Sequence, residues 1–204
     1  MPEYVEVKTQ AQLNRALARE DVIPICIGGG YFSVTDSATV EAWDSATVRA
    51  WDSATVRASK YVAIRKCGDG PKVTGGVIIE VPTSFATPQD WCDYYGVEVK
   101  RGIATLFKGT DEDFATRWSR PAGIYYKPGS KPKAPDWDGG VKECGGGLHG
   151  WPRAHFAEGY AHIVACPVKL AEIVVHKNAS MPEKVKFSRI CSPVYEVDLS
   201  GKRI

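Results

Sequence analysis

Residues 35 to 66 read TDSATVEA, WDSATVRA, WDSATVRA and SKYVAIRK, so that an eight-residue unit occurs four times in succession. Side chains alternate between the two faces of a β-strand, which places Ala38, Val40 and Ala42 on one face of the first unit and Glu41 on the other. The later copies keep this alternation. Each unit is therefore predicted to be a short strand with a small apolar inward face, and a short fixed period of this kind predicts a β-solenoid.

An Asp-Ser pair precedes the strand in three of the copies, at Asp36-Ser37, Asp44-Ser45 and Asp52-Ser53. Asp and Ser side chains can bond their own backbone, so we expect these pairs to turn the chain between strands. An inner face of Ala, Val and Ile is too thin to fill a wide barrel. We therefore expect a flattened coil with two strands, roughly 16 residues, in each turn.

The coil geometry predicts which charged side chains lie next to each other. With two strands per turn, copies two apart stack, so that Glu41 lies beside Arg57 and Arg49 lies beside Arg65. A three-sided coil would instead place Glu41 beside Arg65. The register of the strands therefore distinguishes the two forms of coil.

Two tryptophans, Trp43 and Trp51, have outward parity and fall at corners of the predicted coil. Together with Arg49 and Arg57 they form one candidate partner-binding group, because indole and guanidinium groups concentrate binding energy at protein contacts. The simpler interpretation is that each indole covers a turn or the adjoining domain.

The segment before the repeats is predicted to close one end of the coil. Tyr4 to Val7 alternates like a strand, and Thr9 then caps a helix with Gln12 three residues on, the spacing of a capping box. We expect this helix to end near Glu20 and a strand to follow at Val22 to Ile27. A helix in this position would cover the open end of a solenoid.

Glycines mark further corners of the first domain. Gly28 to Gly30 lacks the Gly-Lys-Ser/Thr continuation of a phosphate loop, which favours a tight corner over a nucleotide site. Gly75-Gly76 is a turn dipeptide, and Val77 to Val81 looks like a buried strand. We therefore predict that a helix-capped β-solenoid occupies residues 1–82.

A small α+β domain is predicted over residues 87–204, after a boundary at Thr83 to Ala86. It begins with a helix, since Thr87 suits the cap and Pro88 the first helical position. Its other predicted elements are a hairpin around Lys100-Arg101-Gly102, strands at Gly123–Tyr126, Ile163–Val168, Ile173–Val175 and Val194–Leu199, and a short helix at Pro152–Tyr160. We expect a compact sheet with helices on one side.

Composition limits the classes of function. The chain has 204 residues, 44% of them hydrophobic, and a net charge of +2, so it lacks the clustered positive charge of a dedicated nucleic-acid binder. Its six cysteines form no Cys-x-x-Cys pair, and no signal peptide or membrane-spanning apolar run is recognisable. These features favour a reduced, cytosolic protein without a membrane partner.

The Asp-Ser-Ala-Thr-Val repeats are joined to a second domain that contains Asp136-Trp137, the run from Cys144 through three glycines and a leucine to His149, and a Cys-Pro-Val at Cys166. This combination resembles uncharacterised proteins encoded by actinobacteriophages, mycobacteriophages in particular, over nearly the whole chain. The resemblance implies a phage gene expressed in the cytoplasm of a host bacterium. It implies no catalytic residues.

A second likeness would make the protein an enzyme. The order of Lys108 on one strand, His149 after a glycine run and Glu196 on an acidic strand is similar to the layout of ADP-ribosyltransferases. Such an enzyme needs a carboxylate that stabilises the developing cation, and Glu196 would be that group. The first strand lacks the usual Arg or His, however, and no Ser-Thr-Ser motif follows. Catalysis is therefore the alternative reading.

Metal and nucleophile sites are weakly supported. The four histidines, with Cys144 and Cys166, match no zinc spacing, and packing explains such residues more simply. Cys144 with His149 could form a nucleophile pair served by the amides of Gly145 to Gly147, but a glycine-rich turn accounts for those residues equally well. We expect neither a metal nor another cofactor.

The sequence is best interpreted as a non-catalytic phage accessory protein that binds a host protein and can slow host growth. Trp137, Trp151 and Arg153 flank the glycine-rich turn of the second domain and form the second candidate partner-binding group. We favour this group over the repeat group, because loops on a scaffold carry function more often than regular elements do.

Overall fold

The computed structural model describes residues 1–143, 145–177 and 179–204. The chain is mostly β, and its internal contacts divide it into two compact units, Met1–Pro82 and Thr83–Ile204.

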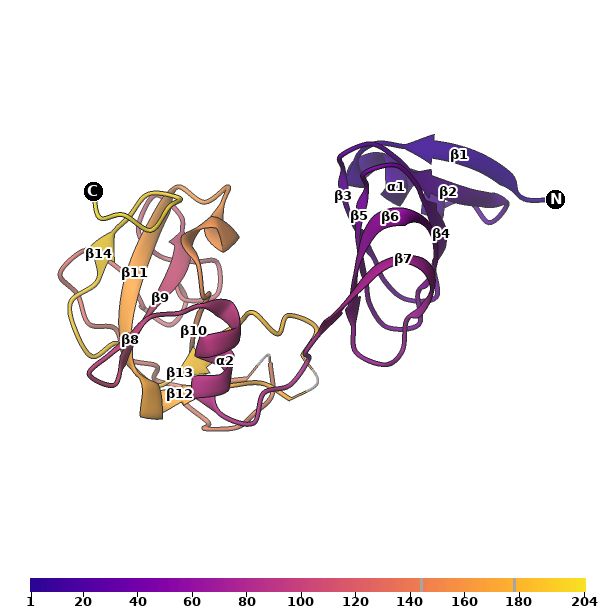
Figure 1. The fold of residues 1–204 in the computed structure, drawn as a ribbon. Helices are drawn as coiled ribbons and strands as arrows, with labels where there is room; N and C mark the ends of the chain where they lie inside the picture. Colours follow the sequence, from indigo (N-terminus) through magenta and orange to yellow (C-terminus); the bar gives the residue numbers. More distant parts are fainter. Residues whose placement is uncertain (144, 178) are drawn as a thin grey trace. The chain divides into compact units, whose positions relative to one another are not determined.

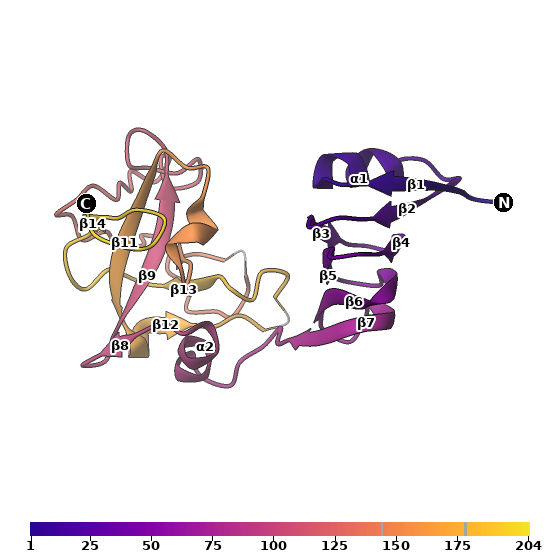
Figure 2. The ribbon, with the colours of Figure 1, turned by 45° about the horizontal axis from the view of Figure 1, so that its top comes forward.

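The first unit is one curled sheet of parallel strands with a single helix. Its elements are β1 (Glu3–Val7), α1 (Gln10–Leu17), β2 (Val22–Cys26), β3 (Tyr31–Val34), β4 (Thr39–Ala42), β5 (Thr47–Ala50), β6 (Thr55–Cys67) and β7 (Lys72–Val81). The strands run around an oval in Figure 1 and lie in successive layers in Figure 2.

The register of the repeats follows a period of 16 residues. Strand β4 pairs with the first half of β6, which sets Glu41 opposite Arg57, and β5 pairs with the second half of β6, which sets Arg49 opposite Arg65. Both pairings predicted for two strands per turn are confirmed. The pairing of Glu41 with Arg65, expected for a three-sided coil, is not the register observed.

The inward face of the repeats is apolar and buried. Val40, Val48 and Val56 are fully buried, as the alternation of the sequence predicted, and Ala42 and Ala50 lie beside them with no exposed area. Complete burial of a valine side chain stabilises a fold by about 1.5–3 kcal/mol, so each repeat adds a similar contribution to the core of the unit.

Helix α1 begins where the sequence predicted and ends earlier. The Thr9 side chain accepts a hydrogen bond from the Gln12 amide, and the Gln12 side chain accepts one from the Lys8 amide at 2.7 Å. Leu13 is fully buried against the strands. The last helical residue is Leu17, three residues before the expected end, because the chain must turn back to enter β2 in register with β1.

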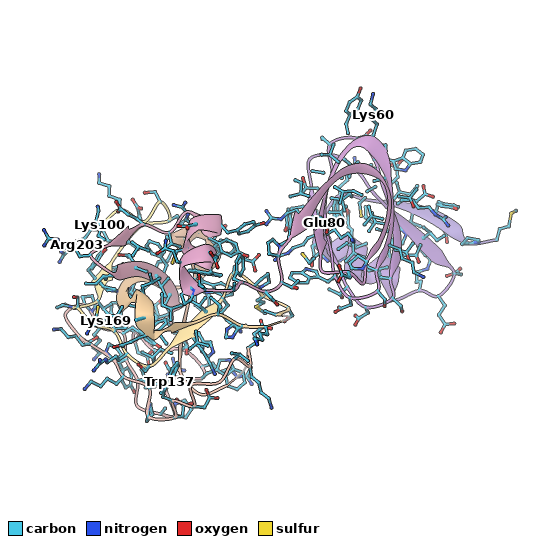
Figure 3. All side chains as sticks on the ribbon, turned by 60° about the horizontal axis from the view of Figure 1, so that its bottom comes forward. Lys60, Glu80, Lys100, Trp137, Lys169 and Arg203 are labelled. Atoms are coloured by element: carbon cyan, nitrogen blue, oxygen red, sulfur yellow. The ribbon has the colours of Figure 1, made fainter. Side chains whose placement is uncertain are left out.

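Strand β7 corrects two expectations. Gly75 and Gly76 do not form a turn between elements: they lie inside β7, both with positive φ, where β6 leaves the register between Ala58 and Ala63. In the described part of the chain β7 pairs with β6 alone, so one side of the strand is uncovered. Val77 to Ile79 are consequently about half exposed rather than buried. Lys60, in the β6 segment that has no partner in β7, points away from the coil (Figure 3).

Over its described residues, the second unit contains two small antiparallel sheets and one α-helix. The elements are α2 (Pro88–Tyr95), β8 (Val99–Lys100), β9 (Ile103–Thr110), β10 (Leu148–Gly150), the short 3-10 helix η1 (Ala154–Ala157), β11 (His162–Lys169), the 3-10 helix η2 (Leu170–Glu172), β12 (Ile173–Val174), β13 (Val185–Phe187) and β14 (Tyr195–Glu196). The sheet orders are β14-β11-β9-β8 and β10-β13-β12.

The start of this unit follows the sequence closely. Thr87 and Asp90 form a reciprocal capping box around Pro88, and α2 ends at Gly96 in the left-handed conformation. The hairpin between β8 and β9 turns at Arg101 and Gly102, which both have positive φ. The helix start and the hairpin were both predicted from turn and cap residues.

Later elements differ from the sequence-based expectation. Gly123–Tyr126 is a loop, because its amides bond locally, as in the bond from Ile124 to Ser119. The helix expected over Pro152–Tyr160 is only the turn η1. Strand β14 ends at Glu196, because Asp198 accepts hydrogen bonds from the amides of Ser200 and Lys202 and turns the chain. The prediction of a single sheet covered on one side by helices was therefore wrong, because the strands form two separate sheets.

Candidate functional site

A pocket of about 530 Å³ lies in the second unit beside β9 and β10. Its lining comes from β9, β10 and several loops, and it combines charged with aromatic side chains. The residues that line it are Lys108, Gly109, Thr116, Trp118, Ser119, Ala122, Ile124, Tyr126, Asp136, Glu143, Gly145, Gly147, Leu148, His149, Trp151, Tyr160 and Lys184. It combines apolar walls with a few polar groups, as small-molecule and peptide sites do.

One wall is built by the glycine-rich run against the Asp136–Asp138 loop. The Gly146 amide donates to the Asp138 carboxylate at 3.0 Å, and the Gly147 amide donates to the Asp136 carboxylate at 3.2 Å. A Cβ on Gly146 would come within 1.7 Å of the Asp136 carbonyl oxygen. Residue 146 is therefore glycine because two backbones approach closely there, which supports the structural interpretation of this turn.

Lys108 contributes an ammonium group to the pocket. It projects from β9, its Nζ donates to the carbonyl oxygen of His149 at 3.1 Å, and it lies 5.2 Å from the centroid of the Tyr126 ring. Burial lowers the pKa of Lys108 to about 8, and the neighbouring Lys184 acts in the same direction. The group still carries its proton at pH 7.

His149 is uncharged at neutral pH. Burial, and then the charges of Lys108 and Lys184, lower its pKa to about 4. Its Nε2 atom is buried and has no hydrogen-bond partner among the described residues, and the ring lies 6.2 Å from that of His176. Burial also lowers the pKa of His176. The two imidazoles are thus held neutral in the interior.

Glu143 and Lys184 form a fixed pair at the pocket. The Glu143 carboxylate accepts hydrogen bonds from the amide and hydroxyl of Ser180 and from the amide of Met181, and lies 3.6 Å from the Lys184 Nζ. Their side chains are each 16% exposed. This pair fastens the chain before β13 to the glycine-rich wall.

Aromatic side chains line the rest of the pocket. Trp118 is 80% exposed and Tyr160 is 50% exposed, whereas Tyr126 is buried. Tyr160 packs on Gly109, where a Cβ would come within 2.3 Å of the ring. Exposed aromatic groups beside a pocket are typical of a contact surface.

The second candidate partner-binding group is only partly assembled at this pocket. Trp151 lines the pocket and stacks on Phe156 with ring centroids 5.9 Å apart. Trp137, labelled in Figure 3, lies on the loop behind the glycine-rich wall, with the Lys186 Nζ 5.8 Å from its ring centroid, and is not a lining residue. Arg153 donates from Nε to the carbonyl oxygen of Tyr95 and so anchors the end of α2.

The repeat group lies in the first unit. Trp43 is 49% exposed, and Trp51 is partly buried beneath the Arg49 guanidinium, which is 4.4 Å from the ring centroid. Arg57 is exposed opposite Glu41. Trp51 thus packs within its own turn, in agreement with the simpler interpretation, while Trp43 retains an exposed indole.

Of the residues suggested by the transferase layout, two meet and one lies apart. Lys108 and His149 both line the pocket and are joined by the hydrogen bond described above. Glu196 does not line it. Val164 separates Lys108 from Glu196 across the sheet, and the Glu196 carboxylate bonds Nδ1 of His162 at 2.6 Å, a ring that stacks on Phe114.

Sequence reasoning missed Trp118, Tyr160 and the pair of Glu143 with Lys184. Trp118 carried one usable signal, because it follows Arg117 in a polar loop where an indole has no obvious core to join. Cys144, and with it the suggested pair with His149, lies outside the described residues. Within the residues described, no group of three His, Cys, Asp or Glu side chains is arranged to hold a metal ion.

Comparison with protein-family models, with curated proteins and with solved structures gives no match to this chain. In the described part of the chain, no helix is both long and apolar enough to cross a membrane.

Proposed function

We propose that the protein is a non-catalytic phage accessory protein that binds a host protein in the bacterial cytoplasm through the pocket of its second unit. The supporting observation is Trp118, which is 80% exposed at a pocket of about 530 Å³ that also contains the partly buried Lys108 ammonium. An exposed indole is unfavourable in water unless a partner covers it, and tryptophan often dominates the binding energy of an interface.

A transferase is the second candidate, favoured by the contact between Lys108 and His149. The position of Glu196 argues against it. Its carboxylate is bonded to His162, whose ring stacks on Phe114, so the group required to face a developing cation is held at a different part of the sheet. Binding uses the pocket as it stands, whereas catalysis needs Glu196 to be released.

Expression in a bacterial host tests the proposal. We compare the wild-type protein with Trp118→Ala, with Glu196→Gln and with Trp43→Ala, a matched loss of an exposed indole in the other unit. The expected result is that Trp118→Ala abolishes capture of the partner and any slowing of growth, whereas the other two variants retain both. Arg153 is left unchanged because it anchors α2. Loss of the growth effect in Glu196→Gln alone, with partner capture retained, favours the enzyme.

We further propose that the first unit is a β-solenoid capped by α1. Support comes from the 16-residue register, from the stacked layers of Figure 2 and from Leu13, which the helix buries against the strands. Leu13→Asp should expose the end of the coil and destabilise it, while Asn14→Asp on the exposed side of α1 should not. Denaturant unfolding of both variants measures the difference.

A further inference from the structure

Lys108 is a charged group of the pocket that is not matched by an opposite charge. Its Nζ donates a hydrogen bond to the His149 carbonyl oxygen and forms no ion pair with a carboxylate of residues 1–143, 145–177 or 179–204. An ammonium has three donors, and a cation in a partly dehydrated pocket is unfavourable without a counter-charge. The structure thus leaves donors of Lys108 available to a ligand.

The acidic residues of the pocket are already engaged elsewhere. Glu143 accepts hydrogen bonds from Ser180 and Met181 and pairs with Lys184. Asp136 accepts from the Gly147 amide. Because Glu143 pairs with Lys184, the ammonium of Lys108 is the lining cation that has no ion-pair partner among the described residues. His149 is neutral at pH 7, so it adds no second positive charge to the pocket.

The walls around Lys108 suit a flat apolar group. The Tyr126 ring lies beneath the ammonium, Trp151 lines the pocket with an indole stacked on Phe156, and Trp118 and Tyr160 are exposed. Offset stacking and edge contacts with aromatic rings are favourable, and planar ligands satisfy them with little loss of conformational entropy.

We propose that this pocket binds an aromatic carboxylate, with the carboxylate on the Lys108 Nζ and the ring against the aromatic wall. This deepens the proposed function, from which it takes the premise that the pocket is a binding site. A host protein can present the group as a C-terminal aromatic residue, and a small molecule can present it free. The shared chemistry is one anionic carboxylate next to one planar ring.

The test is calorimetric titration of the full chain with matched acids and amides. The probes are 2-naphthoate, 2-naphthamide, and a hexapeptide ending in Phe either as the free acid or as the C-terminal amide. A ligand with roughly a dozen non-hydrogen atoms is expected to bind on the order of 1 mM. We expect each acid to bind at least tenfold more tightly than its amide, and tighter binding of the peptide acid than of naphthoate identifies a chain terminus as the source.

Two kinds of variant distinguish the contribution of the Lys108 charge to binding from the contribution of the aromatic wall. Lys108→Met keeps the aliphatic length of the side chain and should remove the preference for acid over amide, whereas Lys127→Met, a change at an exposed lysine that does not line the pocket, should leave it intact. Trp151→Ala should weaken acids and amides alike. Equal affinity of acid and amide for the wild-type protein overturns the inference, and so does an acid preference that persists in Lys108→Met.

The same measurements keep the two proposals apart. If no acid binds but Trp118→Ala still abolishes capture of the host protein, the ligand assignment is wrong and the proposed function stands. If the acids bind through Lys108 but neither capture nor growth depends on Trp118, the proposed function is wrong and the ligand assignment stands.

Discussion

The amide of Asp36 donates a hydrogen bond to the carboxylate of Asp52, one 16-residue turn further along the chain, at 3.3 Å. Both residues have left-handed backbones, with φ of 56° and 52°, and Asp44 between them has φ of 58°. Only glycine, asparagine and aspartate adopt this conformation at low cost. The regular spacing of these aspartates within the repeat therefore has a backbone reason as well as a hydrogen-bonding one.

Asp52→Ala should destabilise the first unit. Alanine in the left-handed region costs about 1–2 kcal/mol, and the bond to Asp36 is lost as well. Asp52→Asn keeps the tolerance for positive φ and a side-chain oxygen, so its effect should be a few tenths of a kcal/mol. Equilibrium unfolding in urea measures both. Equal stability of the two variants would contradict the assigned role of the backbone.

Gly75→Ala should destabilise the first unit more than Gly102→Ala destabilises the second. Both glycines have positive φ, near 78° and 73°, so both substitutions carry the same strain. A Cβ at Gly75 would also come within 2.1 Å of the Ala58 carbonyl oxygen, whereas Gly102 has no neighbour within 4 Å. The strain alone costs about 1 kcal/mol.

Thermal unfolding of both glycine variants gives the comparison. A transition of the first unit that is unchanged in Gly75→Ala would show that β7 moves away from β6 without loss of packing. The Gly102 variant is the control for strain without a clash.

Val48→Asp should unfold the first unit. The side chain is fully buried in the repeats, and an unpaired carboxylate there costs several kcal/mol, comparable with the total stability of a domain this small. Thr47→Asp introduces the same charge on the outward face and should cost under about 0.5 kcal/mol. Far-UV circular dichroism distinguishes a folded from an unfolded unit. A native spectrum for Val48→Asp would refute the inward assignment of the repeat valines.

The sequence predicts the first unit better than the second for a physical reason. Because the repeat is strict, the side-chain alternation that turns Val40 inward also predicts that Val48 and Val56 face inward. Stacking at a fixed period then determines the pairing of Glu41 with Arg57. The repeat pattern does not predict how the first and last strands of the sheet are covered. The exposure of Val77 to Ile79 follows from the absence of a further strand beside β7 in the described chain. No local sequence pattern predicts that absence.

In the second unit, long-range contacts override local pattern. β13 was not predicted, although Val185 and Phe187 alternate with lysines. Lys186 is fully buried there and bonded to Asp138, nearly fifty residues earlier. The pocket depends on the same kind of contact, since Lys108 meets His149 across strands. Cap and turn residues, such as Thr87 and Gly102, were readable because their chemistry is local.

Acid should destabilise the second unit between about pH 6.5 and pH 4. Burial lowers the pKa of His149 to about 4, while an unfolded chain binds this proton near pH 6.5. In that window the unfolded state holds more protons than the folded state, so stability falls as the pH falls, by up to about 1.4 kcal/mol per pH unit for one group. The lowered pKa of His176 adds to the same slope.

His149→Gln should flatten this slope, because glutamine does not titrate. His155→Gln is the matched control, since His155 is exposed on η1. The experiment measures the free energy of unfolding in urea at several pH values between 6.5 and 4.5, above the range in which the paired carboxylates of Asp138 and Glu143 lose their charge. A slope that is the same in the wild-type protein and in His149→Gln would mean that His149 binds its proton equally well in the folded and unfolded states. The assignment of a neutral, partly buried imidazole beside Lys108 would then be wrong.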